Sequence, residues 1–214
     1  MNKILLILTT SFFVFACQQA PKKEIAGGTS EETNTLAFGE VQSTIGHDGH
    51  SQTALSFQKP QSFAASEILG GRFSAATSFE IHAWLKIDSI PQKSELPHNL
   101  IGKFESGDAA LPSEFSLALV NGACGSEMSS LAFFLTGENS AFRCEQAVLS
   151  KTPIKAGLWT LVEVNWDGRY LTLIQDGVQV AREERILASL PFSELPVYFG
   201  KSGVAFTIDA VSLK

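Results

Sequence analysis

A strict alternation of apolar and polar side chains over residues 79–87, FEIHAWLKI, constrains the fold more than any other feature of the sequence. Successive side chains of a β-strand point to opposite faces, so this period predicts a strand that buries one face and leaves the other open. The expected buried face comprises Phe79, Ile81, Ala83, Leu85 and Ile87. The expected open face comprises Glu80, His82, Trp84 and Lys86.

The same period recurs in five later segments, which are EFSLALV, SLAFFLT, WTLVEVNWD, RYLTLIQ and AFTIDAVSL. The core residues expected in the first four are Phe115, Leu117, Leu119, Leu131, Phe133, Leu135, Val162, Val164, Trp166, Leu171 and Leu173. In the last segment, Phe206, Ile208 and Ala210 are expected to face the core, opposite Thr207, Asp209 and Val211. These segments therefore predict strands with one buried face.

Short turn sequences such as TGENS, WDG, QDG and GKSG separate the alternating segments. Many short strands joined by tight turns are typical of a sandwich or a barrel. No stretch has the pattern of a crossover helix, so neighbouring strands are expected to be antiparallel. The residues alone therefore predict an all-β fold of antiparallel strands, either a sandwich or a barrel.

Two Asp-Gly pairs, Asp167-Gly168 and Asp176-Gly177, lie between alternating segments. Their aspartates could be ligands for a metal or a sugar. However, Asp-Gly between two strands is a strong signal for a tight hairpin, because a type I′ turn needs positive φ at both central positions. We interpret both aspartates as turn residues of a β-meander.

Residues 1–16 have the character of a secretory signal peptide. Lys3 precedes the apolar run ILLILTTSFFVFA, which is shorter than the roughly 20 residues of a membrane-spanning helix. The run ends in Ala16-Cys17, which resembles the lipobox of bacterial lipoproteins, although Phe15 stands where that motif usually has a small residue. The resemblance implies cleavage before Cys17 and lipid on its sulfur. An ordinary signal peptide is the alternative.

Residues 17–36 are polar and rich in Gly, Ser, Thr and charge, which indicates a flexible linker between lipid and domain. The folded domain is expected at 37–214. In Gram-negative lipoproteins an Asp directly after the lipid-bearing cysteine favours the inner membrane. Gln18 therefore implies export to the outer membrane of a Gram-negative bacterium.

The three cysteines form an odd number, which needs an explanation in an exported protein. If Cys17 carries lipid, Cys124 and Cys144 remain as a pair, and exported domains lie where disulfides persist. The pair would close a loop of about 20 residues and stabilise the domain by about 3 kcal/mol. Two free thiols are the alternative.

Seven segments in order carry a family resemblance: FEIHAWLKID, LIGKF, FSLALV, LAFFLTG, GLWTLVEVNWDGRYLTLIQDGVQVA, LPVYFGKSG and FTIDAVSL. Over about residues 53–214 the chain resembles the concanavalin A-like lectin/glucanase superfamily, in particular the laminin-G-like domains of bacterial surface proteins. The resemblance implies an antiparallel two-sheet β-sandwich, a jelly roll, that binds carbohydrates or proteins, often with calcium, and this is the predicted fold class. It also implies an opening strand at 54–58 beside the C-terminal strand. The chain departs from the family at Thr160, which follows Trp159, and at Ala210, which follows Asp209.

The open faces of two segments suggest a ligand site. Glu80, His82 and Trp84 share one such face, and Glu163 and Asn165 share the other with Trp159. A tryptophan amid such polar groups suits sugars, because the ring stacks on a pyranose while polar groups hold its hydroxyls. Packing under a loop is the alternative for both tryptophans. The segment REER, 182–185, is interpreted as solvated surface.

Asp209 is the candidate calcium ligand, because the family carries an aspartate there. Calcium needs six to eight oxygens, which a sequence cannot reveal. The alternative is that Asp209 accepts backbone hydrogen bonds from a neighbouring loop. The stretch GHDGH, with His47, Asp48 and His50, is the other candidate metal site, or simply a loop.

The net charge of −6 argues against nucleic acid as a partner. The Glu-x-Asp-x-x-Glu pattern of the superfamily's glucanases is missing from the sequence, so we do not expect an enzyme. We expect a lipid-anchored envelope or cell-surface protein that recognises carbohydrate. A protein-binding, adhesive or structural module is the first alternative, and a glycoside hydrolase or polysaccharide lyase is the second.

Overall fold

The computed structural model of the chain describes residues 37–38, 41–58, 64–104, 112–136, 143–191, 194–200 and 203–214. The predicted signal peptide, Cys17 and the linker at 17–36 lie outside the described residues and remain predictions. Within the described part of the chain, no helix is long and apolar enough to cross a membrane.

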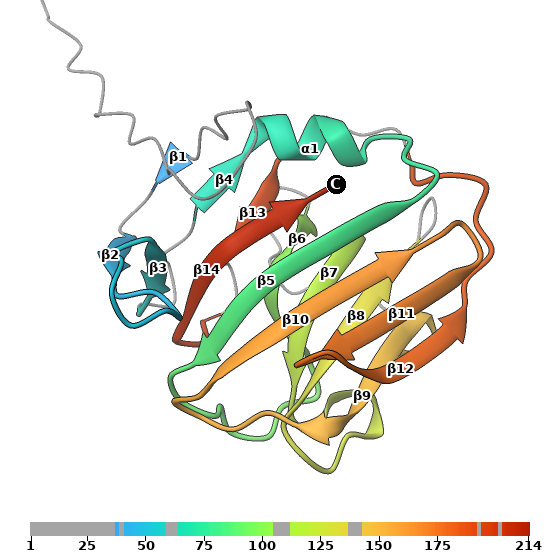
Figure 1. Cartoon of the computed structure of the whole chain (residues 1–214). Coiled ribbons are helices and arrows are strands. Elements are labelled where there is room, and N and C mark those ends of the chain that lie inside the picture. Colours follow the sequence, from blue (N-terminus) through green and yellow to red (C-terminus); the bar gives the residue numbers. More distant parts are fainter. Residues whose placement is uncertain are drawn as a thin grey trace, which may run out of the picture.

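Two seven-stranded antiparallel sheets pack face to face and confirm the predicted β-sandwich (Figure 1). The front sheet has the order β12 (Val178–Glu184), β11 (Tyr170–Gln175), β10 (Trp159–Trp166), β5 (Phe79–Ile87), β14 (Phe206–Leu213), β3 (Ala54–Phe57) and β2 (Gln42–Thr44). The back sheet has the order β1 (Ala37–Phe38), β4 (Ala64–Ser66), β13 (Val197–Phe199), β6 (His98–Phe104), β7 (Pro112–Val120), β8 (Ser130–Leu135) and β9 (Ala147–Pro153). As expected, β3 lies beside the C-terminal strand β14.

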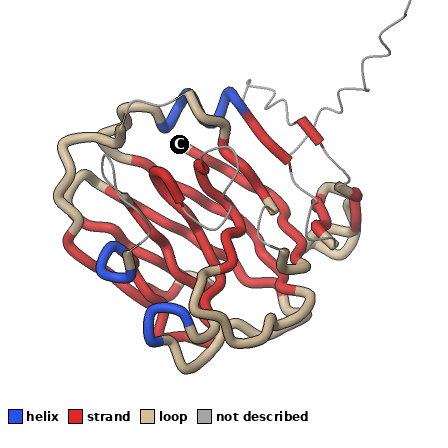
Figure 2. Tube along the Cα trace, turned by 180° about the vertical axis from the view of Figure 1, so that it is seen from behind, coloured by secondary structure: helices blue, strands red, loops and turns tan. Residues whose placement is uncertain are grey.

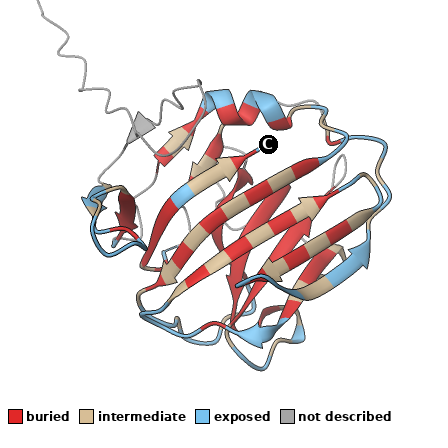
Figure 3. Cartoon of the chain, viewed as in Figure 1, coloured by how far each residue is buried: buried red, intermediate tan, exposed pale blue. Residues whose placement is uncertain are grey.

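The front sheet shows the predicted alternation. In β5 the odd-numbered residues are buried and the even-numbered ones are half-buried, which produces the striped strand in Figure 3. β10 alternates in the same way, with Val162, Val164 and Trp166 buried. The ring of Phe79 lies 5.5 to 6.0 Å, between centroids, from the rings of Phe73, Phe115, Phe133 and Trp166. The core therefore lies between the sheets, and the outer face of the front sheet carries the half-buried polar residues.

The back sheet is buried on both faces at β7 and β8. Phe115, Leu117 and Leu119 join the main core, whereas Ala118, Val120, Ala132 and Phe134 belong to a second apolar cluster. Two short 3-10 helices, η1 (Ala123–Gly125) and η2 (Cys144–Gln146), lie on this side of the molecule (Figure 2). A disulfide joins Cys124 to Cys144, with the Cα atoms 5.1 Å apart, which confirms the predicted pairing.

A β-bulge interrupts β14. Its pairing with β5 shifts register between Asp209 and Ser212, and Ala210 has a φ of 47°. An extra residue in one strand reverses the alternation beyond it. Leu213 is therefore buried and Ala210 is exposed. The prediction that Ala210 faces the core is wrong, whereas Phe206 and Ile208 are buried as expected.

Both Asp-Gly pairs lie at two-residue β-hairpin turns, but only the second pair fills its loop. Between β11 and β12, Asp176 and Gly177 have φ values of 49° and 77°, as a type I′ turn requires. Between β10 and β11 the loop residues are Gly168 and Arg169, and only Gly168, at 88°, has positive φ. That geometry is typical of a type II′ turn. Asp167 precedes the loop and accepts hydrogen bonds from the backbone N–H groups of Arg169 and Tyr170.

One helix, α1 (Glu67–Phe73), was not predicted by the alternation. Ser66 caps its N-terminus by accepting a hydrogen bond from the N–H of Leu69, and Leu69 and Phe73 are buried. A Cβ on Gly70 would lie 2.2 Å from the carbonyl oxygen of Leu195. Glycine at this position therefore lets the helix pack directly against the 195–196 backbone.

Candidate functional site

The pairing of β5 with β10 brings together four of the five predicted ligand-binding residues. His82 pairs with Glu163 and Glu80 pairs with Asn165, so all four lie next to one another on the outer face of the front sheet. Directly opposed residues on antiparallel strands have side chains in contact range. The predicted site is therefore one continuous polar cluster rather than two separate faces.

His82 lies between the two carboxylates of this cluster. Its Nε2 is 2.5 Å from Oε1 of Glu80, and its Nδ1 is 3.6 Å from Oε2 of Glu163. The hydrogen bond from His82 lowers the pKa of Glu80, partial burial opposes that shift, and the charges of His82 and Lys214 add to it. Glu80 is thus held as a carboxylate, with its side chain 41% exposed.

Asn165 contributes an unused hydrogen-bonding atom. Its Oδ1 is buried and, among the described residues, has no hydrogen-bond partner. Buried polar atoms in folded proteins are nearly always paired. This atom does not reach the surface, but the residue as a whole is half-buried, so another part of Asn165 borders the outer face of the sheet.

Trp84, the fifth predicted residue, lies beside this cluster and is already stacked on another ring of the chain. The imidazole of His47 lies parallel to the indole, with 4.6 Å between centroids and 9° between planes. The same imidazole meets Trp159 edge-on at 6.4 Å, and Nζ of Lys86 lies 5.2 Å from the centre of that indole. A loop thus covers one face of Trp84.

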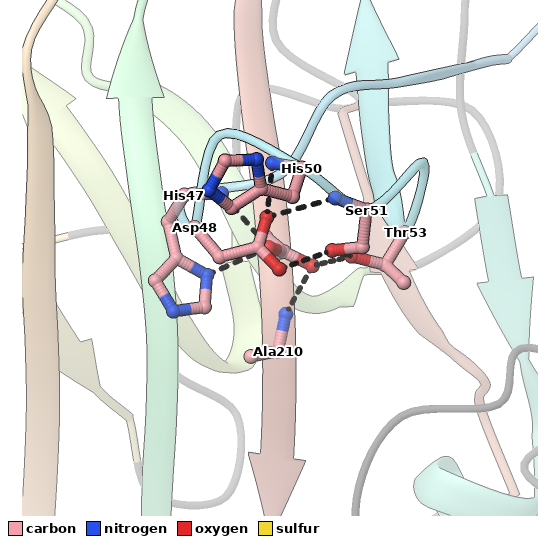
Figure 4. A network of polar contacts seen from close by, with 7 residues as sticks. His47, Asp48, His50, Ser51, Thr53 and Ala210 are labelled. Atoms are coloured by element: carbon pink, nitrogen blue, oxygen red, sulfur yellow. Dashed lines mark hydrogen bonds and ion pairs between the residues drawn. The ribbon is translucent and has the colours of Figure 1, made fainter.

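Asp209 holds this loop in place. Its carboxylate accepts hydrogen bonds from the backbone N–H of His47 (3.0 Å), Nδ1 of His47 (2.7 Å), Oγ1 of Thr53 (2.9 Å) and the N–H of Ala210 (2.9 Å) (Figure 4). Burial raises the pKa of Asp209, but the bonds from His47, Thr53 and Ala210 lower it by more. Gly46 packs so closely that a Cβ there would lie 2.3 Å from Oδ2 of Asp209.

The groups around Asp209 do not fit calcium. Calcium takes six to eight oxygen ligands, whereas N–H and O–H donors already occupy both oxygens of this carboxylate. The described residues contain no group of three or more His, Cys, Asp or Glu side chains that could hold a metal ion. Asp48, from the other candidate stretch, accepts bonds from the N–H of His50 and from the N–H and hydroxyl of Ser51. Calcium binding at another position of the protein is untested, and a calcium titration of the purified protein would detect it.

Three residues outside the prediction extend the polar face across β11 and β12. Thr172 pairs with Asn165 on one side and with Arg182 on the other. The guanidinium of Arg182 lies 4.1 Å from the ring centre of Tyr170. The sequence alone offered one signal for this extension, the alternation of RYLTLIQ, which places Tyr170 and Thr172 opposite the core residues.

The segment 182–185 is only partly the solvated surface that was expected. Arg185 is half-buried and donates hydrogen bonds to the carbonyl oxygens of Glu184, Glu145 and Ala147. The indole N–H of Trp166 in turn donates to the carbonyl oxygen of Arg185. Arg185 therefore connects the end of β12 to the η2 region beside the disulfide.

A sequence profile described as the concanavalin A-like lectin/glucanases superfamily matches residues 61–212. No protein of described function matches the sequence at a significant level.

Several solved structures share the fold at low sequence identity. The binding domain of Paraclostridial mosquitocidal protein 1 aligns with a TM-score of 0.62 and 11% identity, over 85% of this chain and 44% of that one. A botulinum neurotoxin type C structure, described by the dependence of cell entry on two ganglioside molecules, aligns with a TM-score of 0.57 and 13% identity, over 83% and 42%. The carbohydrate recognition domain of Emp47p aligns with a TM-score of 0.56 and 10% identity, over 90% and 93%. The chain thus spans less than half of the two toxin chains and nearly all of the Emp47p domain.

Proposed function

The chain belongs to the concanavalin A-like lectin/glucanases superfamily, and from that premise we propose that it is a carbohydrate-binding protein of the bacterial envelope. Its ligand lies on the outer face of the front sheet, over β5 and β10. The observation that carries the proposal is the cluster of Glu80, His82, Glu163 and Asn165 beside the Trp84–His47 stack.

The chemistry of this face suits a sugar. Carboxylates, an imidazole and a carboxamide are the groups that hold ring hydroxyls, and aromatic rings contact the apolar faces of pyranoses. Because His47 occupies one face of Trp84, the aromatic part of the site is a composite of Trp84, His47 and Trp159. A sugar meets the edge of this stack while its hydroxyls reach the polar cluster.

The arrangement of Glu80 and Glu163 favours sugar binding over sugar hydrolysis. Glycosidases hold two carboxyl groups on either side of the scissile bond with room for a substrate or a water between them. Here the imidazole of His82 lies between Glu80 and Glu163 and contacts both. That arrangement supports a pair of hydrogen-bonding groups rather than an acid and a nucleophile.

The membrane anchor completes the proposal. A lipid on Cys17 and the polar linker at 17–36 would hold the sandwich at the surface of the outer membrane. This part is carried by the sequence alone, since these residues lie outside the described ones.

A glycan array tests the binding function. The full-length protein, purified in detergent, is expected to bind a restricted set of glycans. Replacing Glu163 with Ala removes a carboxylate from the cluster and is expected to weaken that binding at least about tenfold, as for the loss of a charged hydrogen bond. The matched control is Glu127→Gln, which alters an exposed glutamate in the loop between η1 and β8.

Two outcomes of the array would contradict the proposal. If no glycan on the array binds, either with chelator or with added calcium, the protein-binding alternative is favoured. Binding that Glu163→Ala and Glu127→Gln weaken equally would place the ligand elsewhere on the molecule.

A further inference from the structure

A row of four side chains crosses the outer face of the front sheet at right angles to its strands. Strand pairing aligns Glu80 on β5 with Asn165 on β10, Thr172 on β11 and Arg182 on β12. Adjacent strands lie about 4.8 Å apart, so the row spans roughly 14 Å from end to end. A single pyranose is about as wide as one strand spacing, so the row matches an oligosaccharide.

The two ends of this row carry opposite charge. At one end Glu80 and Glu163 flank His82. At the other end stands Arg182, which forms no ion pair with any carboxylate of the described residues. Between them lie Thr172 and Asn165, both half-buried polar residues of the outer face.

Arg182 is oriented and still has free donors. Cζ of its guanidinium lies 4.1 Å from the ring centre of Tyr170, a cation–π contact, and its N–H groups form no hydrogen bond with the described residues. Arg169 lies over the same ring at 5.1 Å, but its Nε donates to Glu184 at 2.9 Å. Arg169 is thus in an ion pair with Glu184, whereas Arg182 is in no ion pair of the described residues.

Backbone hydrogen bonds from Tyr170 and Arg169 lower the pKa of Asp167 and the charge of Arg182 adds to that shift, but no acidic side chain of the described residues forms an ion pair with Arg182. Glu184 is paired with Arg169, and Asp167 accepts two backbone N–H groups of its own turn. Glu183 pairs in register with the core residue Leu171 and so projects to the opposite side of β12. Charges on an edge strand also discourage association of sheets, but that role requires no guanidinium in contact with an aromatic ring.

We propose that the bound glycan is a mixed acidic and neutral oligosaccharide whose uronate carboxylate binds Arg182. This inference rests on the proposed function and specifies its ligand class. The planar carboxylate accepts two parallel N–H bonds from the guanidinium edge. The next sugar places its hydroxyls over Thr172 and Asn165, and the acidic end at Glu80 and Glu163 receives a neutral sugar. A chain with a carboxylate on every ring is disfavoured, since a second carboxylate would approach these glutamates.

Matched pairs of glycans test the inference on the full-length protein in detergent. The probes are tetrasaccharides in which glucuronic or galacturonic acid alternates with a neutral sugar, each beside its carboxyl-reduced form. Wild type is expected to bind the acidic member at least about tenfold more tightly, and rising NaCl is expected to shrink this preference. Arg182→Gln is expected to abolish the preference, and Arg182→Lys to retain part of it, because lysine keeps the charge but not the planar fork.

Arg169→Lys is the matched control, because it alters the neighbouring arginine of the same ring but keeps a cation beside Glu184, and it is expected to leave the preference unchanged. Equal binding of both members of each pair by wild type, or an unchanged preference in Arg182→Gln, would overturn the inference and leave glycan binding intact. If no acidic or neutral glycan binds to wild type, both the inference and the proposed function are overturned. Melting curves of the variants check that each is folded.

Discussion

Asp209 connects parts of the chain that are 162 positions apart. It stands at the bulge of β14, next to Trp84 in register, and holds His47 over the indole of that tryptophan. One buried carboxylate thus determines where the loop lies and how much of the aromatic surface is available to a ligand. The loop over Trp84 is therefore fixed by hydrogen bonds to the single side chain of Asp209.

Replacing Asp209 with Asn is expected to destabilise the domain by about 1–3 kcal/mol, because a carboxamide cannot accept bonds from four donors as a carboxylate does. The loop over Trp84 is expected to detach, so the tryptophan emission should shift to longer wavelength. Urea unfolding and emission spectra measure both effects. Unchanged spectra would mean that Asp209 does not hold the loop.

Acid is expected to weaken the same interaction. The pKa of Asp209 in the folded protein lies below its ordinary value of 3.8. A lowered folded-state pKa means that the carboxylate stabilises the protein fully above about 3.8 and that this contribution is lost as the pH falls through the folded value. The gap in unfolding free energy between wild type and Asp209→Asn should therefore narrow below pH 4. A constant gap down to about pH 2 would contradict this linkage.

The sequence predicted Asp209 as a functional position but not what it binds. The resemblance pointed to calcium, with hydrogen bonding to a nearby loop as the alternative, and the structure shows the hydrogen bonds. His47 lies in the other stretch considered for metal, yet nothing local to either residue reveals their contact. Pairings over such separations depend on the folded sheet, which a periodic pattern does not describe.

At the scale of elements, side-chain periodicity predicted the front sheet well and the back sheet less completely. β5 and β10 have one face in the core and one face open, so their patterns have period two. β8 was predicted from SLAFFLT but is buried on both faces, and β9 was not predicted because its seven residues, AVLSKTP, do not alternate. The helix α1 was missed because its seven residues include two glycines and span only two turns. The bulge in β14 was missed because no particular residue type in the sequence signals the extra residue.

The disulfide is expected to stabilise the back of the molecule. Removing it in Cys124→Ser/Cys144→Ser frees a loop of about 20 residues and uncovers the cluster around Phe134, at an expected cost of about 3 kcal/mol. Thermal melts of the double variant and of wild type, each with and without reductant, measure this cost. The double variant should be insensitive to reductant, and a wild type that is equally insensitive would contradict the prediction.

The hairpin between β11 and β12 depends on the residue type at position 176. Asp176 has positive φ, and its Oδ1 accepts a hydrogen bond from the N–H of Leu161 at 2.8 Å. Asp176→Ala is expected to lose about 1–2 kcal/mol through both effects, whereas Asp176→Asn should lose less, because asparagine tolerates this conformation. Chemical denaturation of the two variants compares them directly. Equal losses would show that the turn does not depend on the side chain.

At the scale of the whole molecule, the two faces of the sandwich differ in what covers them. Disulfide-linked turns lie over the back sheet, while the front sheet presents half-buried polar and aromatic residues. The architecture was predictable from the sequence because alternation and turn chemistry agree along the chain. Which face binds a ligand, and what that ligand is, depends on a few side chains and their neighbours across strands.

The predicted lipid anchor on Cys17 concerns the location of the whole molecule. Cys17→Ser is expected to release the protein from membranes or to block its processing, because the serine cannot carry the thioether-linked lipid. Fractionation of cells into soluble and membrane pools measures the change, with Cys124→Ser/Cys144→Ser as a variant that should stay with the membrane. A Cys17→Ser protein that still fractionates with membranes would refute the lipoprotein assignment.

The position of β14 has a consequence for how the protein is made. The last strand lies between β5 and β3, with most of the domain's sequence between β3 and its partner. Until residues 206–213 have emerged from the ribosome or from an export channel, β3 and β2 have no sheet to join. Such pairing between distant segments slows folding, so the front sheet is expected to close late, when the C-terminal strand becomes available to β3.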